Sequence, residues 1–418
     1  MADQIDIPPY FLCPISLEIM RDPVTVSTGI TYDRENIEKW LFTGDNTTCP
    51  VTKQVLLLEA DLTPNHTLRR LIQAWCTLNA IDRIPTPKPP VDKIQIVKLL
   101  NNAKSSVQSQ MRSLRMLRSI ASESDRNRRC MESAGAVEFL ASLVKVTNSA
   151  AIEKNMGDSN ASNAVDQLTN VSDEALSILH YLQVSSTGLK NLMGKNIDFV
   201  EVLMQILRNG SYQSRAYAAL LLRPMFEVAD PNHLISLKQE LFVEVVRVLR
   251  SQISNQASKA SIQILVETCK WGRNRIKAVE AGAVSVLIEF LLETTDKRAC
   301  EMILTVLDQL CGCAEGRAEL LKHSAGLAVI SKKILRVSHL ASEKAVKVLH
   351  SVAKFSATPS VLQEMLAVGV VAKLCLVLQV NSTTRTLEKA KEILKLHSRV
   401  WKSSPCVPRN LLSSYPSC

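Results

Sequence analysis

The heptapeptide Ala278-Val279-Glu280-Ala281-Gly282-Ala283-Val284 sets the architecture of this chain, because close copies of it recur along the sequence. The copies lie at Cys130–Val137, Leu321–Gly326 and Met365–Val371. Gly326 follows Gly282 by 44 residues, and Gly369 follows Gly326 by 43 residues. Glycine is useful where one helix ends and the next begins, since it tolerates positive φ and close approach of the backbone.

A recurrence of roughly 40–47 residues built from helices is the period of armadillo or HEAT arrays. Steps of 43 residues back from Gly282 reach Gln239 and Asn196, and each lies just before an apolar helical pattern, Leu241–Leu249 and Phe199–Leu207. Each unit exposes an apolar flank that only its neighbours cover, so we expect the units to stack into an all-α solenoid. An irregular helical bundle is the alternative, but bundles lack a fixed period.

Interruptions of the period indicate how the chain is divided. The segment Ile84-Pro85-Thr86-Pro87-Lys88-Pro89-Pro90 cannot continue a helix, and it predicts a stiff linker at residues 81–92. Gly135 and Asn196 are 61 residues apart, and the excess falls in a stretch rich in Asn, Ser, Ala and Asp. We therefore expect a flexible insertion at about 147–170 within a solenoid spanning 93–402, followed by a tail at 403–418.

The composition describes a folded chain with an uneven charge. Its 418 residues are 46% hydrophobic and 22% charged, which argues against disorder and for at least two folding units. No apolar run is long enough to cross a bilayer, and the acidic N-terminus does not resemble a signal peptide. Eleven scattered cysteines suit a reducing compartment, so we expect a cytoplasmic protein, with the nucleus as a second location.

The net charge of +10 is concentrated late in the chain. Residues 1–80 carry −4, whereas residues 322–402 carry +10. A solvated helix face is one interpretation of this excess, and an acidic or phosphorylated protein partner is another. Nucleic-acid binding is disfavoured because Phe355 and Trp401, the aromatic residues of this segment, lie far apart. On the second interpretation, reversing charges among Lys389, Lys391, Lys395 and Arg399 is expected to weaken binding of a target.

The first eighty residues differ in kind from the repeats. Val24–Ser27 and Ile30–Tyr32 flank Gly29 and predict a short β-hairpin. Asp33 is placed to cap a following helix, which carries Ile37, Trp40 and Leu41 on one face. A second helix begins near Asn65, and its predicted apolar face consists of Leu68, Leu71, Ile72 and Trp75. Two loops with the sequence Cys-Pro, Phe11–Leu17 and Cys49–Lys53, flank the first helix.

These blocks resemble the U-box, the zinc-free relative of the RING domain. The matching segments run without interruption through residues 5–80: Ile7–Ile15, Met20–Val24, Gly29–Arg34, Ile37–Leu41, Cys49–Thr52 and Leu62–Asn65. A U-box followed by armadillo repeats is similar to the plant U-box/armadillo class of E3 ubiquitin ligases, and the segment Trp401–Asn410 is similar to that class as well. The resemblance implies a mainly α protein: a small α+β U-box followed by an armadillo-repeat solenoid.

The ligand arithmetic agrees with a module that contains no metal. A cross-braced zinc module needs about eight Cys or His ligands in close pairs. Residues 1–80 offer Cys13, Cys49, Cys76 and His66, with no close pair. We therefore expect no metal and no cofactor, and loops held by hydrogen bonds and ion pairs whose members the sequence does not specify.

The resemblance also implies a function for individual residues. In this family a ubiquitin-charged E2 enzyme docks on the two loops and the central helix, and ubiquitin passes to a lysine of a target protein. The matching E2-binding positions are Ile15, Leu17, Trp40 and Pro50, and Lys53 stands where many ligases place a cation that bridges E2 and ubiquitin. The matching structural positions are Cys13, Pro14, Asp33 and Asn65. Catalysis would come from positioning and not from a nucleophile of this chain.

Several alternatives remain open at this stage. Trp40 at helical spacing from Ile37 also suits partial burial in the core. Cys13 could be imagined as a thioester-forming nucleophile, but free cysteines are usually buried small hydrophobic residues. The whole chain could instead be an armadillo adaptor, or a scaffold for membranes or nucleic acid. By resemblance the solenoid would bind protein substrates in its groove, and self-association is left open.

Overall fold

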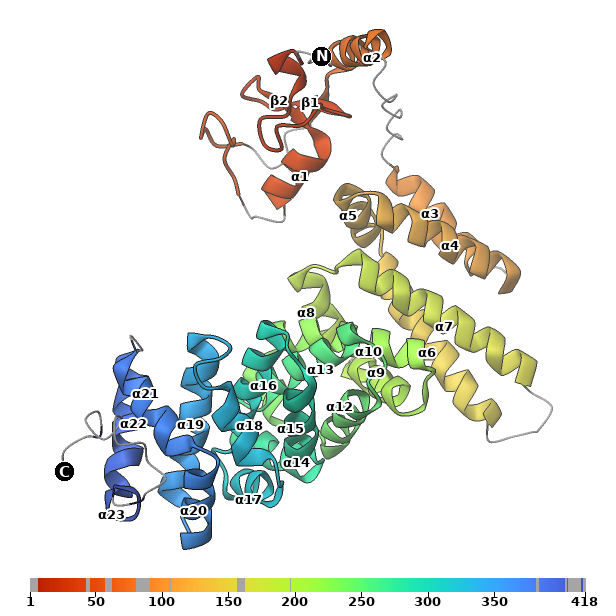
Figure 1. The fold of residues 1–418 in the computed structure, drawn as a ribbon. Coiled ribbons are helices and arrows are strands. Elements are labelled where there is room, and N and C mark those ends of the chain that lie inside the picture. Colours follow the sequence, from red (N-terminus) through yellow and green to blue (C-terminus); the bar gives the residue numbers. More distant parts are fainter. Residues whose placement is uncertain are drawn as a thin grey trace. The chain divides into compact units, whose positions relative to one another are not determined.

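The structure is a computed structural model that describes residues 7–42, 46–56, 62–79, 91–104, 107–155, 162–195, 197–380 and 383–402, together with Ser404 and Tyr415. The chain divides into two compact units: Met1–Phe139 with Tyr181–Gln183, and Leu140–His180 with Val184–Cys418. Helices dominate the described residues, and the strands are confined to the N-terminal module (Figure 1). The expectation of a mainly α chain with a small α+β module is confirmed.

The N-terminal module contains a three-stranded antiparallel sheet and two helices. In chain order its elements are η1 (Pro9–Phe11), β1 (Pro23–Thr25), β2 (Thr31–Asp33), α1 (Arg34–Phe42), β3 (Thr63–Pro64) and α2 (His66–Leu78). The sheet order is β2-β1-β3, with Val24 of β1 opposite Tyr32 on one side and Pro64 on the other. The predicted hairpin is confirmed, and Gly29 at its turn has a φ of 82°. Strand β3 was not predicted from the sequence.

Buried side chains from both helices and the sheet form the core of this module. Its largest members are Phe11, Met20, Val24, Tyr32, Ile37, Leu41 and Ile72. Helix α2 buries Ile72 and Cys76, whereas Leu71 is 52% exposed, so the apolar face predicted for this helix is narrower than expected. The ring of Trp75 packs edge-on against Phe11 of η1, with 5.8 Å between the ring centres, which anchors α2 to η1.

Helices account for nearly all of the remaining described residues. The first unit continues with α3 (Lys93–Asn102), α4 (Val107–Glu123) and α5 (Asp125–Ser133), which pack on one another. The following helices are α6 (Ala136–Asn155), α7 (Ser162–Leu182), α8 (Ser186–Lys195), α9 (Ile197–Asn209), α10 (Tyr212–Val228), α11 (Pro231–Ile235), α12 (Gln239–Ser251) and α13 (Asn255–Thr268). The last are α14 (Gly272–Glu280), α15 (Ala283–Glu293), α16 (Lys297–Leu310), α17 (Ala314–Lys322), α18 (Gly326–Lys333), α19 (His339–Phe355), α20 (Pro359–Ala367), α21 (Val370–Gln379), α22 (Thr384–Leu396) and α23 (Ser398–Trp401).

From α8 onward these helices form repeated triplets. A short first helix, a second helix and a longer third helix recur as α14–α16, α17–α19 and α20–α22. Each third helix contacts the next, so that α10, α13, α16, α19 and α22 form a continuous row (Figure 1). The predicted stacking of helical units is therefore confirmed; the third helices form one row of contacts between repeats, and second helices such as α9, α12 and α15 also contact the next repeat.

The recurring glycines have two different structural reasons. Gly282 and Gly369 precede α15 and α21 with φ of 84° and 76°, a conformation that glycine adopts without steric cost. Gly326 is instead the first residue of α18, and a Cβ atom there would lie 2.2 Å from the carbonyl oxygen of Leu320. The regularly spaced glycines thus serve different purposes: Gly282 and Gly369 form turns, whereas Gly326 allows a close approach of the backbone to Leu320.

The predicted flexible insertion at about 147–170 is wrong for most of its length. Helix α6 continues to Asn155 and α7 begins at Ser162, and only residues 156–161 between them lie outside the described part of the chain. The reason is local, since Ala150, Ala151 and Lys154 all favour helix. The hydroxyl of Thr147 also donates to the carbonyl of Leu143 at 2.9 Å, which satisfies this polar side chain within the helix.

Other predicted segments fall where the structure gives little description. The linker at 81–92 lies outside the described residues except for Val91 and Asp92, and so does Asn196. Of the tail at 403–418 only Ser404 and Tyr415 are described. The hydroxyl of Tyr415 donates to the carbonyl of Leu394 at 2.8 Å, so this tail residue is docked on α22. The domain boundaries given from the sequence stay predictions.

Helix α11 is shorter than the first helices of the neighbouring triplets. It has five residues, whereas α14 and α17 have nine each. A pocket of about 220 Å³ lies beside it, between α9 and α12, and is lined among others by Val200, Met204, His233, Leu237 and Leu241.

Among the described residues no single helix could cross a bilayer. Helices α20 and α21 meet the criteria of length and composition only as a pair, and the pair is bent by 63°.

Candidate functional site

The first loop of the N-terminal module, Cys13–Glu18, is closed by its own backbone. The amide of Cys13 donates to the carbonyl of Glu18 at 2.8 Å, and the amide of Leu17 donates to the carbonyl of Cys13 at 2.8 Å. Leu17 has a φ of 58°, a left-handed conformation that is unfavourable for a residue with a branched side chain. The loop therefore presents Leu17 to solvent, with 74% of it exposed.

The second loop, Cys49–Gln54, repeats the same turn. The amide of Cys49 donates to the carbonyl of Gln54 at 2.8 Å, and the amide of Lys53 donates to the carbonyl of Cys49 at 3.0 Å. Lys53 has a φ of 60°, so it occupies the position that Leu17 takes in the first loop. Two stretches that share the sequence Cys-Pro thus adopt one backbone geometry on either side of α1 in the sequence.

Helix α1 fixes both loops through side-chain hydrogen bonds. The amide nitrogen Nδ2 of Asn36 donates to Oγ of Ser16 in the first loop at 3.1 Å. The indole Nε1 of Trp40 donates to the carbonyl of Thr48 at 2.9 Å, just before the second loop. Because Asn36 and Trp40 are four residues apart, they lie on the same face of the helix. One helix face therefore sets the positions of both loops.

The thiol of Cys13 takes part in the polar network beneath the first loop. Its Sγ accepts from the backbone amide of Asp33 at 3.3 Å and from Nδ2 of Asn36 at 3.8 Å. Cys13 is fully buried. These contacts describe a structural residue, and they match the structural role that the resemblance assigns to Cys13. The neighbouring Pro14 is exposed at the start of the turn.

The thiol of Cys49 anchors the second loop. The hydroxyl of Tyr32 lies 3.0 Å from Sγ of Cys49, and Oγ1 of Thr28 donates to the same sulfur at 3.4 Å. Burial raises the pKa of Cys49, but hydrogen bonds from Thr28, Thr52 and Tyr32 outweigh it and bring the pKa to about 6. Burial also raises the pKa of Tyr32, so its hydroxyl stays protonated and donates to the sulfur. The same hydroxyl accepts from the amide of Val51 at 3.3 Å.

The predicted helix cap at Asp33 is replaced by a different contact. Its Oδ1 accepts from the backbone amides of Arg21 and Asp22, at 2.8 Å each, and so holds the segment before β1. Burial raises the pKa of Asp33, and these two amide hydrogen bonds oppose that rise. Asp22 in turn pairs with Nε of Arg34 at 2.6 Å. The resemblance implies a structural role for Asp33, but the sequence could not identify partners eleven and twelve residues away.

Asn65 connects α2 to the hairpin. Its Oδ1 accepts from the amide of Leu68 at 3.0 Å and caps α2, which begins next to Asn65 as predicted. Its Nδ2 donates to Oγ1 of Thr25 at 3.4 Å and to Oγ1 of Thr31 at 3.5 Å, so the same side chain also fixes β1 and β2. Within the described residues, no group of three or more His, Cys, Asp or Glu side chains is arranged to hold a metal ion.

The four predicted E2-binding residues lie on this doubly anchored frame. Ile15 and Trp40 are half-buried and pack against the core, Pro50 is half-buried, and Leu17 is exposed. Trp40 is thus partly a core residue. The ammonium of Lys53 lies 5.9 Å from the centre of the Trp40 ring, within the range of a cation–π contact. We call Ile15, Leu17, Trp40 and Pro50 the docking residues.

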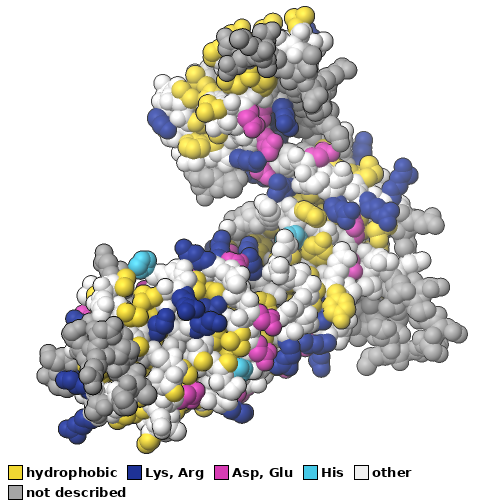
Figure 2. Space-filling model, viewed as in Figure 1, with side chains coloured by type: hydrophobic (Ala, Val, Ile, Leu, Met, Phe, Trp, Pro, Cys, Tyr) yellow, Lys and Arg dark blue, Asp and Glu magenta, His cyan; other side chains and the backbone are white. Residues whose placement is uncertain are grey.

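The late basic residues named from the sequence differ in exposure and in neighbours. Lys389 is half-buried, and its Nζ lies 3.4 Å from Nδ1 of His350 in α19. Lys391 and Lys395 are exposed and line a shallow pocket with Leu396, while Arg399 is exposed on α23. On the face drawn in Figure 2, Lys and Arg side chains are more frequent than Asp and Glu side chains.

Comparison with known families accounts for both parts of the chain. A model of the U-box domain matches residues 7–81, and a model of the plant U-box protein ARM repeat region matches residues 95–417. This chain belongs to the plant U-box/armadillo family of E3 ubiquitin ligases. The N-terminal module is its U-box, and the helical triplets are its armadillo repeats.

Close relatives of this U-box/armadillo protein occur in Arabidopsis thaliana. "E3 ubiquitin-protein ligase PUB22" is 56% identical over 100% of this chain and 100% of its own length. "E3 ubiquitin-protein ligase PUB23" is 55% identical over 100% of this chain and 98% of its own length. Both alignments therefore span the U-box and the armadillo repeats together.

Solved structures share the fold at low sequence identity. One, from a study of a phosphorylation switch in the interaction between cadherin and beta-catenin, has a TM-score of 0.56 at 14% identity. It covers 79% of this chain and 59% of that chain. An engineered protein has a TM-score of 0.50 at 17% identity, covering 78% of this chain and 71% of that chain. At such low sequence identity, these structural similarities show the fold alone.

Two residues of the U-box site were missed by the sequence argument. Asn36 joins α1 to the first loop, and Tyr32 joins the hairpin to the second loop. Side chains alternate between the two faces of a strand, so the pattern of the hairpin could have predicted that Tyr32 is buried. It could not have predicted which groups the hydroxyl of Tyr32 contacts. Nothing in the local sequence of Asn36 distinguishes it from a solvated helix residue.

Proposed function

We propose that this U-box E3 ubiquitin ligase recruits a ubiquitin-charged E2 through Ile15, Leu17, Trp40 and Pro50. The observation that carries the proposal is the pair of matching loops, both hydrogen-bonded to one face of α1. This arrangement fixes the docking residues before a partner arrives, so little conformational freedom is lost on binding. A preorganised apolar cluster of this kind is what a partner's loops need as an anchor.

The exposure of Leu17 supports its role as a contact. A large aliphatic side chain that is 74% exposed, on a residue held at a φ of 58°, does not contribute to the core. Strained backbone of this sort tends to persist at functional sites, where the surrounding structure fixes it. Burial of Leu17 against an E2 would recover the apolar contact that the folded U-box leaves unmade.

Lys53 is the proposed contact to ubiquitin. It occupies the left-handed position of the second loop, which is equivalent to the position of Leu17 in the first loop, and its ammonium lies near the Trp40 ring. In this place a cation can bridge the E2 and its bound ubiquitin and hold the thioester in a reactive geometry. Lysine offers a single compact charge for this role, whereas arginine would offer a planar fork.

Ubiquitin transfer proceeds in this proposal without a covalent intermediate on the ligase. Cys13 and Cys49 are the cysteines nearest the docking residues; both are fully buried, and their sulfur atoms are engaged in hydrogen bonds. The ligase instead restricts the mobile E2–ubiquitin conjugate, and a target lysine attacks the thioester directly. The armadillo repeats hold the target protein during this step.

Reconstituted ubiquitination tests the docking residues. Purified full-length protein is incubated with E1, a panel of E2 enzymes, ubiquitin and ATP, and conjugates are followed on gels. Ile15→Ala and Leu17→Glu are expected to abolish the ladders, since loss of one anchor in a small interface typically costs 2 kcal/mol or more. Leu71→Ala, which truncates an exposed apolar residue of α2, serves as the matched control and should retain activity.

Thermal unfolding of each variant separates loss of docking from loss of the fold. Leu17 is the decisive position because its side chain is largely exposed, so the folded U-box should tolerate its replacement. Full ladders from a folded Leu17→Glu variant would contradict the proposed docking surface. Absence of ladders from the unmodified protein with every E2 would favour an adaptor role instead.

A further inference from the structure

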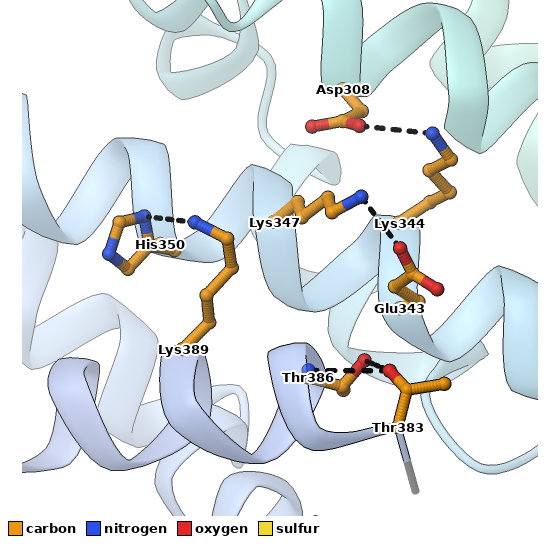
Figure 3. A network of polar contacts seen from close by, with 8 residues as sticks. All are labelled: Asp308, Glu343, Lys344, Lys347, His350, Thr383, Thr386 and Lys389. Atoms are coloured by element: carbon orange, nitrogen blue, oxygen red, sulfur yellow. Dashed lines mark hydrogen bonds and ion pairs between the residues drawn. The ribbon is translucent and has the colours of Figure 1, made fainter.

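Three stacked third helices bring several charged side chains onto one surface. In Figure 3, Lys344 of α19 is directed at Asp308 of α16, Lys347 of α19 at Glu343, and Lys389 of α22 at His350 of α19. The Nζ of Lys344 lies 3.3 Å from Oδ2 of Asp308, and that of Lys347 lies 2.6 Å from Oε1 of Glu343. These side chains come from positions up to 81 residues apart, so the surface exists only in the folded solenoid.

Positive charge is in excess on this surface. Burial raises the pKa of Asp308, while Lys344, Lys347 and Lys389 all lower it, which shows that three ammonium groups act on one carboxyl. Glu343, the second carboxylate, is acted on by Lys347, Lys344 and Arg385. Nζ of Lys389 lies 3.4 Å from Nδ1 of His350, and Nε2 of the same ring lies 2.8 Å from Oε2 of Glu392, which also pairs with Lys354 at 3.2 Å.

The surface cations are held in place more firmly than ordinary surface lysines. The side chains of Lys344 and Lys347 are 19% and 24% exposed, whereas those of Lys238 and Lys322 are 69% and 78% exposed. Partial burial lowers the local dielectric, so each charge acts on an incoming group more strongly than a fully solvated one. Their long side chains are also already restrained, which reduces the entropy lost on binding.

We propose that Lys344, Lys347, Lys389 and Arg385, the lysine surface, bind an acidic segment of a substrate in extended conformation. Lys344 and Lys347 are one helical turn apart, and α19 and α22 are neighbours, so the cations are spaced roughly 5–10 Å from one another. Carboxylates two residues apart on an extended peptide are separated by about 7 Å, which suits this spacing. The inference rests on the proposed role of the repeats in holding substrates.

A peptide suits this surface better than a nucleic acid does. Asp308 and Glu343 lie between the cations and would repel a continuous run of phosphates, whereas a peptide places its charges at intervals. The drawn network contains no Phe, Tyr or Trp side chain on which a base could stack, and both ring nitrogens of His350 already have a polar neighbour, Lys389 at 3.4 Å and Glu392 at 2.8 Å (Figure 3). The surface therefore carries charges of both signs, and its cations stand at separate positions instead of forming a continuous positive stripe.

Peptide binding to the full-length protein tests the proposal. The probe is a fluorescein-labelled peptide of twelve residues with Asp at every second position in a Ser/Gly background, and its Asn counterpart is the uncharged comparison. The triple variant K344Q/K347Q/K389Q is expected to bind the acidic probe about 10-fold or more weakly than the unmodified protein, because charge-assisted contacts are lost. The matched triple variant K391Q/K395Q/R399Q removes the same charge from exposed positions and should bind within about twofold of the unmodified protein.

Each other outcome overturns the inference. Equal loss in both triple variants would show that only the general positive field attracts the probe, and absence of binding would show that the surface takes no acidic peptide. Tighter binding of a twelve-nucleotide single-stranded DNA or of phosphatidylserine vesicles, lost in the first triple variant, would assign the surface to another class of partner. E2-dependent autoubiquitination measured on the same variants should be unchanged, so failure here is distinguishable from failure of the ligase function.

Discussion

At the scale of single residues, the U-box uses sulfur atoms as hydrogen-bond acceptors where a RING domain uses metal. Cys13 accepts from the amide of Asp33, and Cys49 is held by Tyr32 and Thr28. Cys13 and Cys49 are the first residues of the two loops, Cys13–Glu18 and Cys49–Gln54, so each contact of a sulfur atom fixes the position of its loop. The sequence indicated that polar pairs replace zinc, but the pairs themselves involve residues from separate elements.

The shifted pKa of Cys49 predicts a pH dependence of stability. Its pKa is about 6 in the folded protein against 9.0 for an ordinary thiol, so the folded state favours the thiolate. The stabilisation is therefore complete above pH 9 and is lost as the pH falls through 6. Relative to Cys49→Ser, the unmodified protein should gain free energy of unfolding between pH 6 and pH 9, as measured by urea denaturation.

Cys76→Ser provides the control for this titration. Burial raises the pKa of Cys76, so its thiol is protonated in both the folded and the unfolded protein well below pH 9, and its replacement should change stability by nearly the same amount from pH 6 to about pH 8. If the curves of the unmodified protein and Cys49→Ser run parallel from pH 6 to pH 9, the thiolate of Cys49 has no stabilising role.

At the scale of elements, an asparagine at the third residue of α14 and of α5 fixes that helix to the end of the helix before it. Nδ2 of Asn274 in α14 donates to the carbonyl of Thr268 at 3.0 Å, and Asn127 in α5 donates to the carbonyl of Ile120 at 3.3 Å. These amides satisfy carbonyl groups that a helix end leaves without partners. In α17 the corresponding position is Gly316, where the backbone approaches so closely that no side chain fits.

Two glycine substitutions of opposite expected effect test this packing. A Cβ atom at Gly316 would lie 2.0 Å from the carbonyl oxygen of Leu310, so Gly316→Ala is expected to lower the free energy of unfolding by about 1–3 kcal/mol. Gly194 of α8 has no atom within 4 Å of its added Cβ, so Gly194→Ala should raise it by up to about 1 kcal/mol. Urea denaturation measures both, and equal effects would contradict the close approach at α17.

At the scale of the whole molecule, the chain joins a docking module to a long surface built by repetition. The U-box docking residues are fixed by contacts within about fifty residues of sequence, whereas the row of third helices extends over α10 to α22. Its relatives PUB22 and PUB23 align across both parts. The transfer of ubiquitin requires both: the U-box to restrain the E2 conjugate and the repeats to bring a target lysine near it.

Lys53 provides the test of this restraint, because its proposed role begins after the E2 has docked. Lys53→Gly removes the ammonium and also suits the left-handed φ of 60°, so the loop should keep its shape. Discharge of ubiquitin from E2 to free lysine should slow by about 10-fold, as expected for the loss of a charged hydrogen bond. Affinity for the E2 should change by less than about twofold.

The neighbouring Gln54→Ala serves as the control, since Gln54 is exposed and its loop contacts are made by its backbone. This variant should discharge ubiquitin at the rate of the unmodified protein. Equal rates for Lys53→Gly and Gln54→Ala would assign Lys53 to the loop alone and not to contact with ubiquitin.

The sequence by itself determined the repeat, the helical character and the U-box. These follow from local periodicity, since a 3.6-residue apolar pattern and a 43-residue recurrence are properties of the chain before it folds. The Cys-Pro loops, the hairpin at Gly29 and the start of a helix near Asn65 were predictable for the same reason. The predicted loop at 147–170 was wrong because a polar composition does not exclude a helix when its residues favour one.

Only the tertiary structure decided which distant side chains meet. Asp33 contacts Arg21 and Asp22 instead of the helix that follows it, and Lys389 of α22 lies beside His350 of α19. The direction of a side chain around a helix follows from the sequence, but its partner on another helix depends on how the repeats stack. Stacking is set by the summed packing of many buried residues, and no local pattern contains that information.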